Sequence, residues 1–151
     1  MSPAMYGELK RRPKTGTRAR RSLLERQKTW LPENPLPLIL CLEDNESYLR
    51  LRKAVLEKNG YNVIGVSTVK DALGTLRDAP VCLVISDHML HGTTGTALAG
   101  ELKKIKPEVP VILYSGQQPD TLENVDVFIN KNVSTQDFLG LVRDVVKRYS
   151  A

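Results

Sequence analysis

From residue 38 onward the chain alternates short apolar runs with longer stretches whose apolar residues recur every three or four positions. The short runs are typical of strands buried on both faces, and the longer stretches have the period of amphipathic helices. Strands and helices that alternate in this way favour a doubly wound parallel sheet. Strands are predicted at residues 38–42, 61–67, 81–86, 111–114 and 125–130, and helices at residues 45–58, 68–77, 96–104 and 134–149.

Five such strands predict an α/β fold with the flavodoxin-like order 2-1-3-4-5, whose switch point lies between the first and third strands. Polar residues that can cap helices precede three amphipathic stretches, at Asn45, Thr68 and Ser134. The first helix is predicted to bury a face formed by Tyr48, Leu51, Val55 and Leu56. The last helix is predicted to bury Phe138, Leu141, Val142, Val145, Val146 and Tyr149.

Polar side chains follow four of the predicted strands at the point where each strand ends. Glu43 and Asp44 follow the first strand, Asp87 the third, Ser115 the fourth and Lys131 the fifth. Because the carboxyl ends of parallel strands meet at one edge of the sheet, these groups are expected to converge there. Three carboxylates at close range would raise one another's pKa values, so a hard divalent cation such as Mg²⁺ is the natural counter-charge.

The positive charge of the chain is unevenly distributed. Residues 1–35 contain nine Lys or Arg and three Glu, giving +6, whereas residues 36–151 contain thirteen Lys or Arg and fourteen Asp or Glu, giving −1. The first segment is predicted to be a basic, disordered tail with a Pro-rich linker, and residues 36–151 to form one domain. The basic run at residues 10–21 is either a solvated tail or a site for nucleic acid or another anionic surface.

The sequence also bears on where the protein works. No stretch has the roughly 20 apolar residues of a membrane span, and no export signal is recognisable. A cytoplasmic protein is therefore expected. Cys41 and Cys82 both fall in predicted core strands, where a free thiol packs as a small apolar group.

In their order and spacing, the polar residues at the strand ends resemble those of a response regulator receiver domain of two-component signalling. The resemblance covers about residues 38–149 and includes a glycine eight residues after Asp87 and an aromatic residue three before Lys131. Each of these residues is a weak signal by itself, but the whole set in this order is a strong signal for the family. The set consists of Glu43, Asp44, Asp87, Gly95, Ser115, Phe128 and Lys131.

The resemblance implies a single-domain response regulator in which Asp87 accepts a phosphoryl group from a histidine kinase or phosphotransfer protein and signals to a downstream protein partner. Lys131 and Ser115 would contact the phosphoryl oxygens, and Ser115 and Phe128 would form a switch. From the sequence alone, Phe128 is either that switch or a simple core aromatic. The resemblance further implies Mg²⁺ bound by Glu43 through water, Asp44, Asp87 and the backbone carbonyl of Met89.

The sequence departs from the family's pattern at several places. His91 and Asn132 stand where the family usually has proline. Only twelve residues, Pro119 among them, separate Ser115 from Phe128, which is several fewer than usual. The fourth helix of the fold is therefore expected to be shortened to one turn or absent.

Three other functions compete with phosphoryl acceptance. A phosphatase that forms an aspartyl phosphate needs a general acid two residues after its nucleophile, and Met89 at that position cannot serve, so no enzyme is expected. A nucleic-acid-binding protein would use residues 10–21, with the domain as regulator or scaffold. A flavin or nucleotide module of the same fold is disfavoured, because an acidic rim repels phosphate unless a metal intervenes.

Overall fold

The computed structural model of the protein describes residues 35–149. Its strands are β1 (Leu38–Leu42), β2 (Asn62–Val66), β3 (Leu83–Ser86), β4 (Met89–Leu90), β5 (Thr93–Thr94), β6 (Val111–Ser115) and β7 (Val127–Asn130). Its helices are α2 (Glu46–Lys58), α3 (Val69–Asp78), α4 (Gly95–Ile105) and α5 (Thr135–Tyr149). The predicted tail lies outside the described residues, apart from its last position, so that its disorder stays a prediction.

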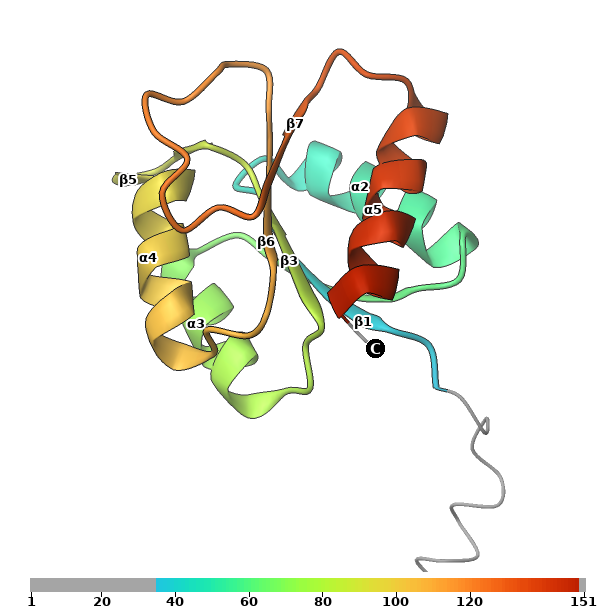
Figure 1. Ribbon diagram of the computed structural model, residues 1–151, viewed down its shortest axis with the longest axis horizontal. Helices are drawn as coiled ribbons and strands as arrows, with labels where there is room; N and C mark the ends of the chain where they lie inside the picture. The colour runs from blue at the N-terminus through green and yellow to red at the C-terminus, as the bar shows by residue number, and fades with distance from the viewer. Residues whose placement is uncertain (1–34, 150–151) are drawn as a thin grey trace, which may run out of the picture. The chain divides into compact units, whose positions relative to one another are not determined.

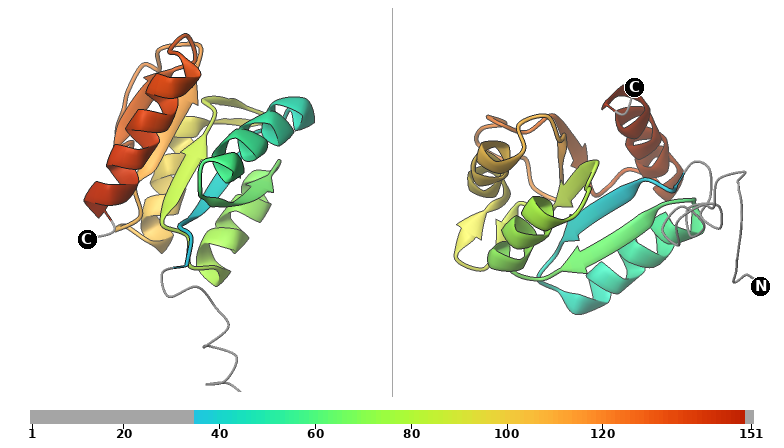
Figure 2. Two further views of the ribbon diagram at one scale, coloured as in Figure 1. Left: turned by 90° about the vertical axis from the view of Figure 1, so that its right-hand side faces the viewer. Right: turned by 90° about the horizontal axis from the view of Figure 1, so that it is seen from below.

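Five parallel strands form the central sheet in the order β2-β1-β3-β6-β7. This confirms the predicted α/β fold and the order 2-1-3-4-5. Helices α2 and α5 cover one face of the sheet, and α3 and α4 cover the other (Figures 1 and 2). None of the described helices is long and apolar enough to cross a membrane.

Two hydrophobic clusters fill the space between the sheet and its two helix layers. Alternate residues of β1 enter different clusters, because successive side chains of a strand point to opposite faces. Ile39 and Cys41 pack with α2 and α5, whereas Leu40 and Leu42 pack with α3 and α4. Cys41 is buried as predicted, but Cys82 lies just before β3 and is only half-buried.

Each helix begins at a side chain that accepts a hydrogen bond from a backbone N–H of its first turn. Asn45 accepts from Tyr48 and Thr68 from Asp71, as predicted. Ser134 accepts from Asp137, which confirms the third predicted cap. Thr94 does the same for α4, which begins at Gly95, one residue earlier than expected. Such caps contribute about 1 kcal/mol each and place the helix starts at the carboxyl ends of the strands.

The buried face of α2 is only partly the predicted one. Tyr48 is 57% exposed and Leu51 is 65% exposed, whereas Arg52 is buried, with only 8% exposed. Leu56 is fully buried, as predicted, but Leu49 packs on the sheet in place of Tyr48 and Leu51, so the helix is rotated by about one residue relative to the predicted face. In α5 the prediction of burial is likewise wrong for two residues, Leu141 and Tyr149, which remain 38% and 43% exposed.

The segment between β6 and β7 contains no helix. Of the two predicted forms, one short turn or no helix, the structure therefore has the second. The segment crosses over α4 (Figure 1), and a hydrogen bond from Lys103 of α4 to Asp126 fixes its end. Pro119 is buried within it. Residues 116–126 therefore form a loop.

Candidate functional site

The polar residues at the strand ends are held by hydrogen bonds that continue the sheet's ladder. The backbone N–H of Asp87 donates to the carbonyl oxygen of Leu42 at 3.3 Å, and that of Lys131 donates to the carbonyl oxygen of Ser115 at 2.9 Å. Glu43 similarly donates to the edge strand β2 at 3.1 Å. The sheet itself therefore fixes the backbone of the site at the switch point.

An ammonium group bridges two of the predicted carboxylates. Nζ of Lys131 lies 3.0 Å from Oδ2 of Asp87 and 3.6 Å from Oε1 of Glu43. The other oxygen of Asp87 accepts a hydrogen bond from the backbone N–H of His88 at 2.7 Å. Three elements far apart in sequence, the ends of β1, β3 and β7, thus meet at one cluster of charge.

Glu43 is the most deeply buried of the carboxylates, at 2% exposure. Burial raises its pKa above the ordinary value, and the nearby Asp87 acts in the same direction. A hydrogen bond from the backbone N–H of Asn45 and the charges of Lys131 and Arg52 act against this rise in pKa. The ionised form is therefore costly here unless cations surround it.

Asp44 lies at the mouth of the site, with its side chain 25% exposed. Its Oδ2 lies 3.4 Å from Nδ1 of His91, whose side chain is 96% exposed. Met89 belongs to the short antiparallel pair β4 and β5, which the sequence predicted only as a loop. Met89 is 57% exposed, and its role as a backbone ligand stays a prediction.

Ser115 is 2% exposed at the end of β6, and its Oγ accepts a hydrogen bond from the backbone N–H of Gln117 at 3.2 Å. Phe128 of β7 pairs in register with Leu113 and is half-buried. Its neighbours Val127 and Ile129 pack toward α2 and α5, so the ring of Phe128 belongs to the opposite face of the sheet. Whether that ring moves stays a prediction.

Gly95 allows α4 to begin against the backbone of Asp87. A Cβ atom there would lie 2.5 Å from the carbonyl oxygen of Asp87 and would overlap a methyl group of Leu113. The backbone N–H of Gly95 donates to the carbonyl oxygen of His88 at 2.6 Å. Only glycine fits this close approach, which gives a physical reason for its place in the sequence pattern.

The donor set fits a hard cation. Within residues 35–149, no three His, Cys, Asp or Glu side chains are arranged as a ready-made metal site. Mg²⁺, however, needs only one or two carboxylates, because it keeps several water ligands. Asp44 and Asp87 supply carboxylate oxygens of this kind on adjoining strand ends, and the bridging Lys131 compensates for only part of the charge.

Two residues that the sequence did not single out belong to the site. Arg52 lies 3.4 Å from Oε1 of Glu43 through Nη2, and its Cζ lies 4.9 Å from the centre of the Tyr114 ring. Nζ of Lys131 lies 5.7 Å from the same ring. The spacing of Leu49, Arg52 and Leu56 on one helical face is the signal that could have revealed the arginine.

The chain matches the family model described as the response regulator receiver domain over residues 39–143. The transcriptional regulatory protein YkoG of Bacillus subtilis (strain 168), itself uncharacterized, is 27% identical over 116 residues, covering 73% of this chain and 51% of YkoG. The transcriptional regulatory protein GlrR of Escherichia coli (strain K12) is 28% identical over 116 residues, covering 73% of the chain and 26% of GlrR. The chain thus spans about half and a quarter of the length of these relatives.

Solved structures are similar over most of the described residues. A CheY-like response regulator receiver domain protein from Methanospirillum hungatei JF-1 is 26% identical, with a TM-score of 0.69, covering 76% of this chain and 97% of that one. The response regulator TrrA from Thermotoga maritima, in complex with Mg(2+)-BeF, is 23% identical, with a TM-score of 0.68, covering 73% and 99%. The likeness to TrrA shows the fold alone.

Proposed function

The chain belongs to the response regulator receiver domain family, and from this premise we propose that Asp87 accepts a phosphoryl group from a phosphohistidine donor. In that step a carboxylate oxygen of Asp87 forms a bond to phosphorus as the bond from phosphorus to the histidine nitrogen breaks. The donor would be a histidine kinase or a phosphotransfer protein, and a downstream protein partner would receive the signal. The proposed role, in the cytoplasm, is that of a phosphoacceptor rather than an enzyme.

The contact between Lys131 and Asp87 carries the proposal. An ammonium group 3.0 Å from one oxygen of Asp87 is placed to pair with phosphoryl oxygens attached to that carboxylate. Phosphoryl transfer depends mainly on positioning and on charge stabilisation, and a lysine at this distance supplies both. The acceptor side chain is 14% exposed, so that one side remains open to a donor.

The metal expected at this site is Mg²⁺, which would supply positive charge to the transferring phosphoryl group. Asp44 and Asp87 would ligate it directly, Glu43 through water, and Met89 through its backbone carbonyl. The fold shared with TrrA, which was solved with Mg(2+)-BeF, is consistent with this assignment. Lys131 would pair with the phosphoryl oxygens next to the Mg²⁺ ion.

Ser115 is the proposed trigger of the response. Its hydroxyl would donate a hydrogen bond to a phosphoryl oxygen and so move toward Asp87. Because Oγ of Ser115 accepts from the N–H of Gln117, this movement would pull on the segment that follows β6. Phe128 would then turn into the space that Ser115 leaves.

Incubation with Mg²⁺ and acetyl phosphate tests the assignment. Mass spectrometry of the intact chain should show one added phosphoryl group, and Asp87→Asn should take up none. Asp126→Asn, which alters a carboxylate away from the site, is the matched control and should be labelled like the wild type. Equal labelling of Asp87→Asn and the wild type would reject Asp87 as the acceptor.

The metal is tested by thermal unfolding. Mg²⁺ that binds only the folded state raises the melting temperature by mass action, so a titration should shift the wild-type curve upward. The shift should be smaller in Asp44→Asn, which removes a proposed ligand. A melting temperature that does not respond to Mg²⁺ would reject the metal site.

Nucleic-acid binding through residues 10–21 is the second candidate, favoured by the charge of +6 on residues 1–35. Binding of this kind weakens steeply as salt rises, because it depends on the release of counterions. A gel shift that needs the basic segment and disappears at higher salt would support it. A chain that shifts no DNA or RNA even at low salt would exclude it.

A further inference from the structure

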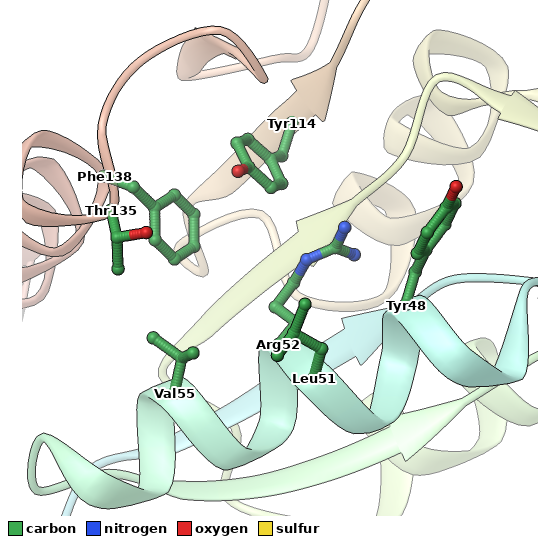
Figure 3. A pocket seen from close by; sticks show the side chains of 7 residues that line it. All are labelled: Tyr48, Leu51, Arg52, Val55, Tyr114, Thr135 and Phe138. Atoms are coloured by element: carbon green, nitrogen blue, oxygen red, sulfur yellow. The ribbon is translucent and has the colours of Figure 1, made fainter.

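Arg52 is a buried cation on the face of α2 that packs on the sheet. Its side chain is 7% exposed, and its Nη2 lies 3.4 Å from Oε1 of the equally buried Glu43. Figure 3 shows the side chain directed from α2 toward β6, on the side where Tyr114 lies. The other terminal nitrogen of the guanidinium group, Nη1, has no hydrogen-bond partner.

The buried position of Arg52 does not by itself call for a charged side chain. A buried N–H without a partner lowers stability, and a buried ion pair is often no more stable than apolar side chains of the same volume. The cavity beside Arg52 has a volume of about 210 Å³ and a largely apolar lining, so an unbranched apolar side chain would be accommodated. The other residues around it are Tyr48, Leu51, Val55, Tyr114, Thr135 and Phe138. A role for the charge itself is therefore to be sought.

The charge of Arg52 acts on the acidic site through Glu43. Two cations converge on Oε1 of Glu43, Arg52 at 3.4 Å and Lys131 at 3.6 Å. Lys131 lies closer to Asp87, at 3.0 Å. Since Arg52 already compensates the negative charge of Glu43, Lys131 is free to pair with the carboxylate of Asp87.

Five residues determine the net charge of the site. Glu43, Asp44 and Asp87 contribute −3 when ionised, and Lys131 and Arg52 contribute +2, which leaves −1. Without Arg52, the three carboxylates and Lys131 would together carry −2. A divalent cation binds more tightly to the more negative set, and at a partly buried site this difference is only partly screened.

We propose that Arg52 is a positioning residue that compensates Glu43, holds Lys131 on Asp87 and weakens the binding of Mg²⁺ at the acidic site. This rests on the metal site of the proposed function but not on phosphorylation. A purely structural arginine would have the opposite effect, because its loss would loosen the site and weaken the binding of Mg²⁺. The direction of the change in affinity therefore distinguishes the two roles.

Isothermal titration of the full chain with MgCl₂ at pH 8 tests the proposal. Arg52→Gln should lower the Kd for Mg²⁺ by about tenfold. Arg52→Lys, which keeps the charge, should stay within about twofold of the wild type. Arg50→Gln is the matched control, because Arg50 is an exposed arginine of the same helix and its loss changes the net charge of the chain equally. It should also stay within about twofold.

Unchanged or weaker Mg²⁺ binding in Arg52→Gln would overturn the proposal. If that variant does not fold, Glu43→Gln/Arg52→Gln leaves no unpaired buried charge and is compared with Glu43→Gln/Arg50→Gln. The first double variant should bind Mg²⁺ more tightly, and equal affinities would reject the role.

If no variant binds Mg²⁺, both the metal site and this role are wrong. Failure of Asp87 to accept a phosphoryl group would instead reject the proposed function and leave the comparison of affinities intact.

Discussion

Nζ of Lys103 lies 2.7 Å from Oδ2 of Asp126, and this ion pair joins α4 to the helix-free segment before β7. The same carboxylate oxygen accepts a hydrogen bond from the backbone N–H of Val111 at 2.8 Å. Lys103 also donates to the carbonyl oxygen of Val109 at 2.9 Å. One carboxylate thus connects α4, the start of β6 and the approach to β7. Because residues 116–126 form no helix, these contacts help to determine where the segment returns to the sheet.

Asp126→Ala should therefore destabilise the domain by about 1–2 kcal/mol, since it removes the hydrogen-bond acceptor of the Val111 N–H and the carboxylate that pairs with Lys103. Urea unfolding measures the change. Glu101→Ala is the matched control, because its ion pair with Lys104 is largely exposed, at 55% and 74% for the two side chains. It should cost no more than about 0.5 kcal/mol. Equal losses in the two variants would contradict the anchoring role of Asp126.

Gly95→Ala should destabilise the protein by about 1–3 kcal/mol, because the added methyl group would overlap Leu113 and the backbone of Asp87. Gly74→Ala in α3 offers a control of opposite sign. Nothing lies within 4 Å of a Cβ at Gly74, and alanine stabilises a helix interior by up to about 1 kcal/mol relative to glycine. If the unfolding free energy of Gly95→Ala does not fall, the close approach at Gly95 is relaxed at little cost.

Glu43 predicts a pH dependence of stability. Its folded-state pKa is raised above 4.5 by burial, so the folded protein favours the protonated form. The stability gained from protonation is complete below pH 4.5 and is lost as the pH rises through the folded-state pKa. In buffer without divalent cations, the unfolding free energy of the wild type should therefore fall relative to Glu43→Gln across this range. Glu57→Gln, which replaces an exposed glutamate of α2 and retains Glu43, should follow the wild type instead. A parallel course for Glu43→Gln and the wild type would show that Lys131 and Arg52 fully compensate Glu43.

The strand order and the polar residues at the strand ends were predictable from sequence, because both follow from local patterns. Apolar runs mark buried strands, and the parallel topology brings their carboxyl ends to one edge. The contact between Asp87 and Lys131 follows from that topology, although 44 positions separate the two residues. The short spacing between Ser115 and Phe128 predicted one turn or no helix, and the structure has no helix there.

The rotation of α2 was not predictable in the same way. Two overlapping faces of the helix carry apolar residues, and the sequence favours the one with Tyr48 and Leu51. The structure exposes these two residues and buries Arg52, because Glu43 and Tyr114 offer the guanidinium an ion pair and an aromatic surface. Both partners lie on other elements, so no local pattern reports them. Hydrophobic periodicity therefore failed to predict that Arg52, a charged residue of the site, is buried.

The last prediction concerns how the site affects the rest of the domain. After incubation with Mg²⁺ and acetyl phosphate, hydrogen exchange should change most in residues 116–127 and around Lys131, and little in α3. Ser115→Ala should still accept the phosphoryl group on Asp87 but lose most of this change, because the hydroxyl that links the phosphoryl group to Gln117 is gone.

Thr121→Ala separates this coupling from a general loosening of the segment. Oγ1 of Thr121 accepts a hydrogen bond from the backbone N–H of Glu123 at 3.1 Å, which resembles the bond between Ser115 and Gln117 but lies outside the site. Phosphorylated Thr121→Ala should therefore keep the wild-type pattern of exchange. A full response in Ser115→Ala would mean that the signal leaves Asp87 through another element, and Lys131, which contacts Asp87 directly, would be the next residue to test.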